Sequence, residues 1–226
     1  MAFQAGLLNM GGFIAFQRFV SHITGFASFF GRDIGTGNYG HALGMLAVPV
    51  LFLIGSMISG QLVDIRLKKG LKPFYYIAFG AIFILVLATL VGGIVGMYGQ
   101  FGESFERGRN YFPLALLCLA CGIQNATITS VSRSVVRTTH LTGLTTDLGI
   151  GIIRVLNGRR SEAPGQDEVH ANLMRAGLIL SFGLGSVAGG YAFTLYEYGG
   201  FLLPAFTSGN IFMITYYYQV FRRPRS

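Results

Sequence analysis

The stretch IAFGAIFILVLATLVGGIV, residues Ile77–Val95, is an uninterrupted apolar run. It has the length that a helix needs to cross a bilayer, which is about 20 mainly apolar residues. Similar runs on both sides of it bring the number of predicted spans to six: Ala2–Val20, Leu43–Val63, Phe74–Met97, Tyr111–Val131, Leu173–Phe193 and Phe201–Val220. The sequence therefore predicts an all-α membrane protein of about six transmembrane helices.

The composition supports the same fold class. The 226 residues are 52% hydrophobic and only 12% charged, and the mean hydropathy is +0.55. A charged share about half that of a typical soluble domain cannot cover a water-facing surface, so lipid is the expected solvent. No Lys or Arg precedes Arg18, so the first segment lacks the basic region of a secretory signal peptide and is expected to be retained.

The basic residues indicate a topology. Lys and Arg outnumber Asp and Glu by 17 to 9, and most of them lie in three regions between or after the spans, at about 66–72, 154–175 and 222–225. Six spans place these three regions on one side of the membrane and the two loops with little net positive charge on the other. By the positive-inside rule, both termini are predicted to be cytoplasmic. The positive charge is therefore read as a topology signal, and no nucleic-acid partner is expected.

A polar motif occurs twice, as Ser21-His22-Ile23-Thr24-Gly25 and as Thr139-His140-Leu141-Thr142-Gly143. Its neighbours recur in the same order: Asn9 and Asn125, Arg18 and Arg137, Asp33 and Asp147, and a Gly-Ser segment in the following span. Each copy holds three spans, so the second copy starts on the opposite side of the membrane. We therefore expect two inverted three-span repeats, residues 1–100 and 101–226, with a cytoplasmic loop at about 157–170 in the second.

The repeated motif interrupts an apolar run with glycine and polar residues, which predicts that the first helix of each repeat is broken. Lipid cannot satisfy the backbone groups that such a break exposes, so matched breaks predict a shared polar site at mid-membrane. The residues expected to bind substrate there are Asn9, His22, Thr24, Asn125, His140 and Thr142. The alternative is that each motif ends its span and begins a loop, although the apolar residues that follow it favour a half-helix.

Five charged residues at or near membrane depth are candidates for gating or coupling: Arg18, Asp33, Arg133, Arg137 and Asp147. Asp33 with Arg137, and Asp147 with Arg18, are example pairs between the halves, and structural salt bridges are the alternative. Small residues spaced four apart are assigned to helix packing across the axis between the repeats. These are Gly55, Ser56, Ser59, Gly60, Gly185, Ser186, Gly189 and Gly190.

Cofactor chemistry has little support in the sequence. His22 and His140 could carry protons, hold a haem or simply bond to broken backbone, and haem is disfavoured because no further His lies inside a span. Cys118 and Cys121 are interpreted as two small residues on one helix face. No catalytic motif is present, and Gly149-Ile150-Gly151 lacks the third glycine of a dinucleotide fingerprint. No cofactor or metal is expected, and an enzyme is the less favoured class.

Several of these segments resemble the YoaK-like family of bacterial integral membrane proteins, a domain of unknown function. The matching pieces are the Gly6–Gly12 region, Val20–Gly25, Gly122–Ala126 and Thr138–Gly149. The resemblance covers nearly the whole chain. It implies a multi-span protein of the bacterial cytoplasmic membrane, and it brings no established activity.

The residues favour a small-solute or ion transporter that works by alternating access of the two repeats around a midplane polar site. A second hypothesis is a non-transporting scaffold that binds lipid or a protein partner, with a homodimer through the Gly-Ser faces as one form. A third is a membrane enzyme or cofactor carrier. The solute, the coupling ion and the direction of transport do not follow from the sequence.

Overall fold

The computed structural model describes residues 1–102, 110–132, 141–158 and 166–222, and every regular element in these ranges is a helix. The helices in chain order are α1 (Ala2–Phe16), α2 (Ile23–Gly35), α3 (Tyr39–Ser59), α4 (Ile65–Lys68), α5 (Tyr75–Ile94), α6 (Tyr111–Val131), α7 (Leu141–Gly158), α8 (Gln166–Tyr196) and α9 (Leu202–Tyr216). A π-helical turn (Gly60–Asp64) joins α3 to α4, and a 3-10 turn (Glu197–Phe201) joins α8 to α9. A second π-helical turn (Tyr217–Phe221) follows α9.

Four helical stretches are long and apolar enough to cross a membrane: Tyr39–Lys68, Tyr75–Ile94, Tyr111–Val131 and Glu168–Phe221. The last of these contains α8 from Glu168 onward and all of α9. The helix α1 is also apolar, but its 15 residues make it shorter than a full span. The chain is thus built as a helical membrane protein, with four span candidates among the described residues where the sequence predicts six spans.

Two predicted boundaries differ from the structure. The first span, expected to reach Val20, ends as a helix at Phe16. The loop expected at about 157–170 is helical at both described ends, because α7 runs to Gly158 and α8 begins at Gln166. With 31 residues, α8 is about 46 Å long, which exceeds the roughly 30 Å hydrocarbon core. Its first turns can therefore extend beyond the bilayer as helix.

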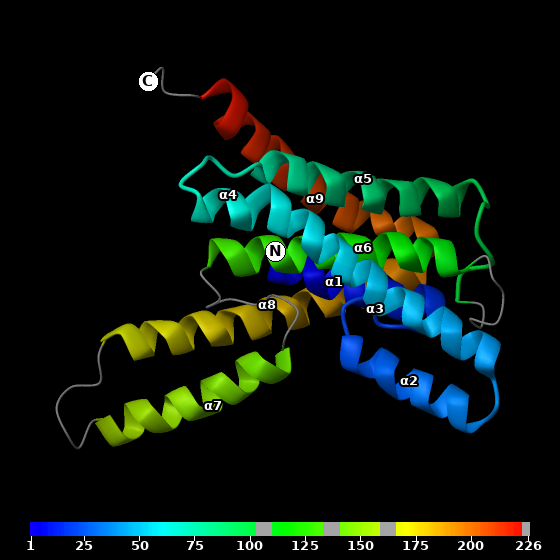
Figure 1. Ribbon diagram of the computed structural model, residues 1–226, viewed down its shortest axis with the longest axis horizontal. Coiled ribbons are helices and arrows are strands. Elements are labelled where there is room, and N and C mark those ends of the chain that lie inside the picture. Colours follow the sequence, from blue (N-terminus) through cyan, green and yellow to red (C-terminus); the bar gives the residue numbers. More distant parts are fainter. Residues whose placement is uncertain (103–109, 133–140, 159–165, 223–226) are drawn as a thin grey trace.

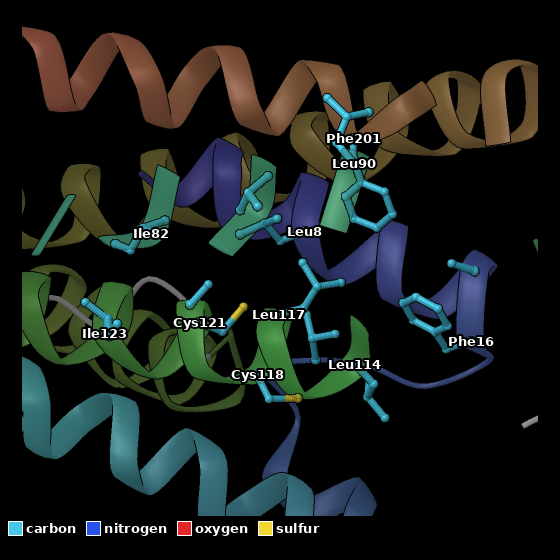
Figure 2. Close-up of a cluster of buried hydrophobic side chains, with 14 of the residues drawn as sticks. Leu8, Phe16, Ile82, Leu90, Leu114, Leu117, Cys118, Cys121, Ile123 and Phe201 are labelled. Atoms are coloured by element: carbon cyan, nitrogen blue, oxygen red, sulfur yellow. The ribbon is translucent and has the colours of Figure 1, made fainter. Parts of the chain in front are cut away.

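The helices pack in pairs that are far apart in the sequence. The most extensive contacts join α1 to α8 and α3 to α6, and α5 packs against α9. The shorter flanking helices each pack mainly against one long helix: α2 packs against α3, and α7 packs against α8 (Figure 1). The apolar centre lies where α1, α5, α6 and the turn before α9 meet, and it includes Leu8, Ile82, Leu117 and Phe201 (Figure 2).

Glycines set the distance of both major crossings. A Cβ placed on Gly6 of α1 would lie 2.2 Å from the carbonyl oxygen of Phe182 on α8, and one on Gly185 of α8 would lie 2.0 Å from that of Phe3. The crossing of α3 and α6 repeats this contact through Gly55 and Gly122, where the corresponding gaps to backbone oxygens are 2.3 and 2.2 Å. Only a residue without a side chain lets two backbones approach so closely.

The contact between α5 and α9 is built from the same two residue types on each helix. A Cβ on Gly80 would lie 3.1 Å from the ring of Phe212, and one on Gly209 would lie 3.1 Å from the ring of Phe83. The two rings stack with their centroids 6.3 Å apart. Each helix therefore offers a glycine to the phenylalanine of the other.

The basic segments gather at one end of the bundle. The helix α4, the π-helical turn after α9, the last turns of α7 and the first turns of α8 all lie towards the left end of the long axis (Figure 1). These segments carry Arg66, Lys68, Lys69, Arg154, Arg175 and Arg222. The described parts of the three regions that the sequence assigns to one membrane side are thus at one end of the molecule.

Candidate functional site

The repeated motif of the first half forms a break between two helices. The helix α1 stops at Phe16, and the next residue, Gln17, has a left-handed backbone with φ of 53°. The new helix α2 begins at Ile23 after His22. The side-chain oxygen of Asn9 accepts hydrogen bonds from the Ser21 hydroxyl at 3.0 Å and from its backbone N–H at 3.4 Å. Asn9 therefore ties the connecting segment back onto the middle of α1.

A cavity of about 520 Å³ opens beside this break. Its lining comes from α1, the connecting segment, α2, α7 and α8, so both halves of the chain contribute. The lining residues are Asn9, Phe19, Ser21, His22, Ile23, Thr24, Leu141, Thr142 and Phe182. The cavity thus combines apolar walls with hydroxyl, carboxamide and imidazole groups.

Two helices start at this cavity and run away from it in opposite directions. The first residues of α2, Ile23 and Thr24, line it together with the first residues of α7, Leu141 and Thr142. Both helices begin near the middle of the long axis, and they extend to opposite ends of the bundle (Figure 1). Neither has an acidic residue in its first turn. The positive ends of two helix dipoles therefore meet at one place.

Residues 1–214 match the family described as a protein of unknown function, DUF1275. The chain belongs to the DUF1275 family. This match confirms the resemblance that the repeated motif carries. No curated protein and no solved structure matches the chain.

Four of the six residues expected to bind substrate lie together in the cavity of this DUF1275 protein: Asn9, His22, Thr24 and Thr142. The fifth, Asn125, is on α6 with 9% of its surface exposed, and it is not among the lining residues. The sixth, His140, lies outside the described residues. The second copy of the Asn9–Ser21 contact would need Thr139, which also lies outside them.

Two of the candidate gating residues, Asp33 and Arg18, contact side chains that are close to them in the sequence. Asp33 is 3% exposed, and its carboxylate pairs with Arg32 at 2.7 Å and with the His41 ring at the start of α3. The guanidinium of Arg18 lies 4.3 Å from the centre of the Phe29 ring on α2. Asp147 is exposed on α7. The example pairings of Asp33 with Arg137 and of Asp147 with Arg18 stay predictions, since Arg133 and Arg137 lie outside the described residues.

The residues assigned to packing lie along the two major crossings of the DUF1275 fold. The Ser56 hydroxyl donates to the Phe52 carbonyl at 3.0 Å and lies 3.3 Å from the carbonyl of Gly122. The hydroxyls of Ser59 and Thr127 are both buried and are 2.8 Å apart, so they bond across α3 and α6. On α8, a Cβ on Gly189 would come within 3.1 Å of Met10. In contrast, Gly60 has nothing within 4 Å of its Cβ position.

Metal chemistry has no centre in the described ranges, where no three His, Cys, Asp or Glu residues are grouped to hold an ion. Cys118 and Cys121 are free thiols buried in α6. They belong to the apolar centre of the bundle (Figure 2).

The predicted binding set omitted Ser21 and the four residues that supply apolar walls: Phe19, Ile23, Leu141 and Phe182. All of these except Phe182 lie within or beside the repeated motif, which was a usable signal. Phe182 comes from α8, and its carbonyl is the group that Gly6 approaches. Its place at the cavity follows from the crossing of α1 and α8, which the sequence pattern does not specify.

Proposed function

We propose that this protein is a small-solute transporter whose substrate binds in the cavity between α2 and α7. The observation that carries the proposal is that α2 and α7 both begin at one cavity, with Ile23 and Thr24 of the first motif and Leu141 and Thr142 of the second in its lining. A polar cavity between two interrupted segments is the arrangement in which membrane transporters hold their substrates. Asn9, His22, Thr24 and Thr142 would contact the solute, and the sequence motif adds His140 from the second half.

The transporter is proposed to consist of two inverted three-span repeats. In this arrangement α1 corresponds to α6, α3 to α8 and α5 to α9. Three matched contacts support this. The glycine crossing of α1 with α8 has a counterpart in that of α6 with α3. In the contact of α5 with α9, each helix places a glycine against a phenylalanine of the other. The support of α2 by α3 has a counterpart in the support of α7 by α8.

The proposed motion is an exchange of access between the two membrane sides. The helices α2 and α7 run from the cavity to opposite ends of the bundle, and each is supported mainly by one long helix. Movement of α2 would open one route and movement of α7 the other. The pair of Asp33 with His41 holds α2 on α3, so it is the proposed latch of the first route. The basic end of the bundle is proposed to face the cytoplasm of a bacterial cell.

The first test fills the cavity and measures transport. Purified protein is reconstituted in liposomes and assayed with a panel of small neutral, cationic and anionic solutes. Thr142→Trp places a large ring at the cavity, and we expect it to reduce the flux of the transported solute at least tenfold. Thr146→Trp, one turn further along the exposed side of α7, is the matched control. Equal flux of wild type and T142W for every solute would contradict the proposal.

The second test asks whether the cavity opens to both sides. Thr24→Cys and Thr142→Cys introduce thiols at the cavity, while native Cys118 and Cys121 are 0% and 1% exposed and should react slowly. A membrane-impermeant thiol reagent is added to oriented vesicles from one side at a time. We expect both engineered thiols to react from both sides, with rates that change when solute is present. Labelling from one side only, whatever the solute, argues for a fixed pocket and against alternating access.

A further inference from the structure

We infer that a water molecule is bound inside the helix bundle, between Gln4 of α1 and Gln124 of α6. This site is separate from the proposed transport cavity, because neither glutamine is among the residues that line the cavity. Its existence therefore does not depend on whether the protein transports a solute. Two features of the fold lead to it: polar atoms that are buried without a partner, and a helix contact that brings them together.

Both glutamines are enclosed by the protein. Each has only 1% of its surface exposed, although glutamine is mostly an exposed residue. The Nε2 and Oε1 atoms of Gln4 and the Oε1 atom of Gln124 have no hydrogen-bond partner in the described part of the chain. Buried polar atoms of native proteins nearly always have a partner, and an ordered water supplies it where protein groups do not. The three atoms therefore point to a bound polar molecule.

The first turn of α1 anchors the side chain of Gln124. The Nε2 atom of Gln124 donates to the carbonyl of Met1 at 3.1 Å. The same carbonyl closes the first turn of α1, because it also accepts from the backbone N–H of Ala5. Gln4 belongs to this turn. The oxygen of Gln124 is thus held at the turn that carries Gln4.

The helix register directs Gln4 towards the same interface. Gln4 lies one turn before Leu8 on the buried face of α1, and Leu8 packs in the apolar centre with Leu117 and Cys121 of α6 (Figure 2). Along α6, Leu117, Cys121 and Gln124 are spaced four and three residues apart, so they share one helix face. Since α1 and α6 run in opposite directions (Figure 1), Gln4 faces Cys121 and Gln124.

One water completes the bonding of all three atoms. The NH₂ group of Gln4 is a donor, whereas the side-chain oxygens of Gln4 and Gln124 are acceptors. A water can accept from the NH₂ group and donate one hydrogen to each oxygen, which gives it the roughly three bonds typical of buried waters. One direct bond between the two carboxamides would satisfy two of the atoms and leave the third without a partner.

A cation fits this site less well than water. Hard cations such as Ca²⁺ and Mg²⁺ take about six or more oxygen ligands. The glutamines offer two oxygens, and the nearby carbonyl of Met1 already accepts two hydrogen bonds. The hydrogens of the Gln4 NH₂ group would repel a positive charge. Within the described ranges the one buried carboxylate is that of Asp33, which pairs with Arg32 and His41 on other helices.

X-ray radiolysis of the wild-type protein tests the site without a mutation. Radiolysis converts bound water into hydroxyl radicals, which oxidise the side chain beside them. Cys121 shares the face of Gln124, whereas Cys118 is turned about 120° from Gln124 around α6. Both thiols are free and buried, with 1% and 0% of their surfaces exposed. We expect Cys121 to be oxidised at least fivefold faster than Cys118, measured by mass spectrometry, and equal rates would overturn the inference.

Three variants assign the radical source to the glutamines. Gln4→Met and Gln124→Met keep the length of the side chains and remove their polar atoms. Leu8→Met is the matched control, because it places the same residue one turn later on the same buried face of α1. In Q4M/Q124M we expect the two thiol rates to agree within about twofold, while L8M keeps the fivefold difference. A difference that survives in Q4M/Q124M would place the water elsewhere and refute the inference.

Melting temperatures in detergent separate a bound water from polar atoms that are simply unsatisfied. If a water joins the glutamines, Q4M removes its other contacts and leaves the Gln124 oxygen poorly bonded, so the melting temperature falls. The double variant Q4M/Q124M should recover most of this fall, because it removes both partners. If no water is bound, Q4M removes two unsatisfied polar atoms and the melting temperature rises. A rise in Q4M would therefore contradict the inference.

Discussion

Replacing Gly185 with alanine tests the close backbone approach of α8 to α1. The added Cβ would lie 2.0 Å from the carbonyl oxygen of Phe3, whereas an ordinary contact begins at 3.4 Å. The missing 1.4 Å cannot come from a side-chain rotation, because the obstructing atom belongs to the backbone of α1. The two helices must therefore separate at their crossing, and the neighbouring contacts loosen with them.

The control for this variant lies two residues away on the same helix. Gly183 has nothing within 4 Å of its Cβ position, so Gly183→Ala gains the usual helix propensity of about 0.5–1 kcal/mol. G185A gains the same propensity but incurs an overpacking cost of about 1–3 kcal/mol, so the two variants should differ by roughly 1–3 kcal/mol in free energy of unfolding. Denaturant unfolding in mixed micelles measures this difference. If G185A and G183A unfold at the same denaturant concentration, the close approach of α1 and α8 is refuted.

Three further changes probe single contacts. Thr127→Val leaves the buried hydroxyl of Ser59 without its partner and should cost about 1–3 kcal/mol, whereas the double variant S59A/T127V should recover most of that loss. Unfolding of T127V, S59A and S59A/T127V beside the wild type gives the coupling. Asn9→Ala removes the acceptor of the Ser21 backbone N–H, so exchange of the Ser21 amide should become at least fivefold faster, while exchange in α5 stays unchanged. Asp33→Asn weakens both ion pairs of this carboxylate, and exchange should then quicken throughout α2; unchanged exchange would argue against the latch proposed there.

The sequence predicted the span helices where a continuous apolar run carries the signal. The predicted span Tyr111–Val131 has the same limits as α6, and Phe74–Met97 contains all of α5. The C-terminal limit of the first span was placed too far along, because Phe19 and Val20 resume the apolar sequence after Gln17 and Arg18, where the backbone turns. Hydropathy reports solvent preference and is insensitive to such a turn.

The duplicated polar motif and its repeated neighbours also pointed to four residues that line the cavity: Asn9, His22, Thr24 and Thr142. They did not reveal that Asp33 pairs with His41, because that contact depends on how α2 folds back onto α3. The glycine and phenylalanine pairs of α5 and α9 were missed for another reason. Gly80 and Phe83 recur as Gly209 and Phe212 at the same spacing. Both pairs lie inside apolar runs, where glycine and phenylalanine are common and a repeat of two residues is not distinctive.

The packing of α1 on α8 and of α6 on α3 has a consequence for biosynthesis. When α1 leaves the ribosome, its partner is still unmade, and α3, α5, α6 and α7 must all be synthesised before α8 arrives. Until then, the glycine face of α1 has only lipid or the insertion machinery to cover it. The nascent chain must therefore delay its final assembly until late in translation, and an N-terminal fragment that stops before α8 would be a natural target for membrane proteases.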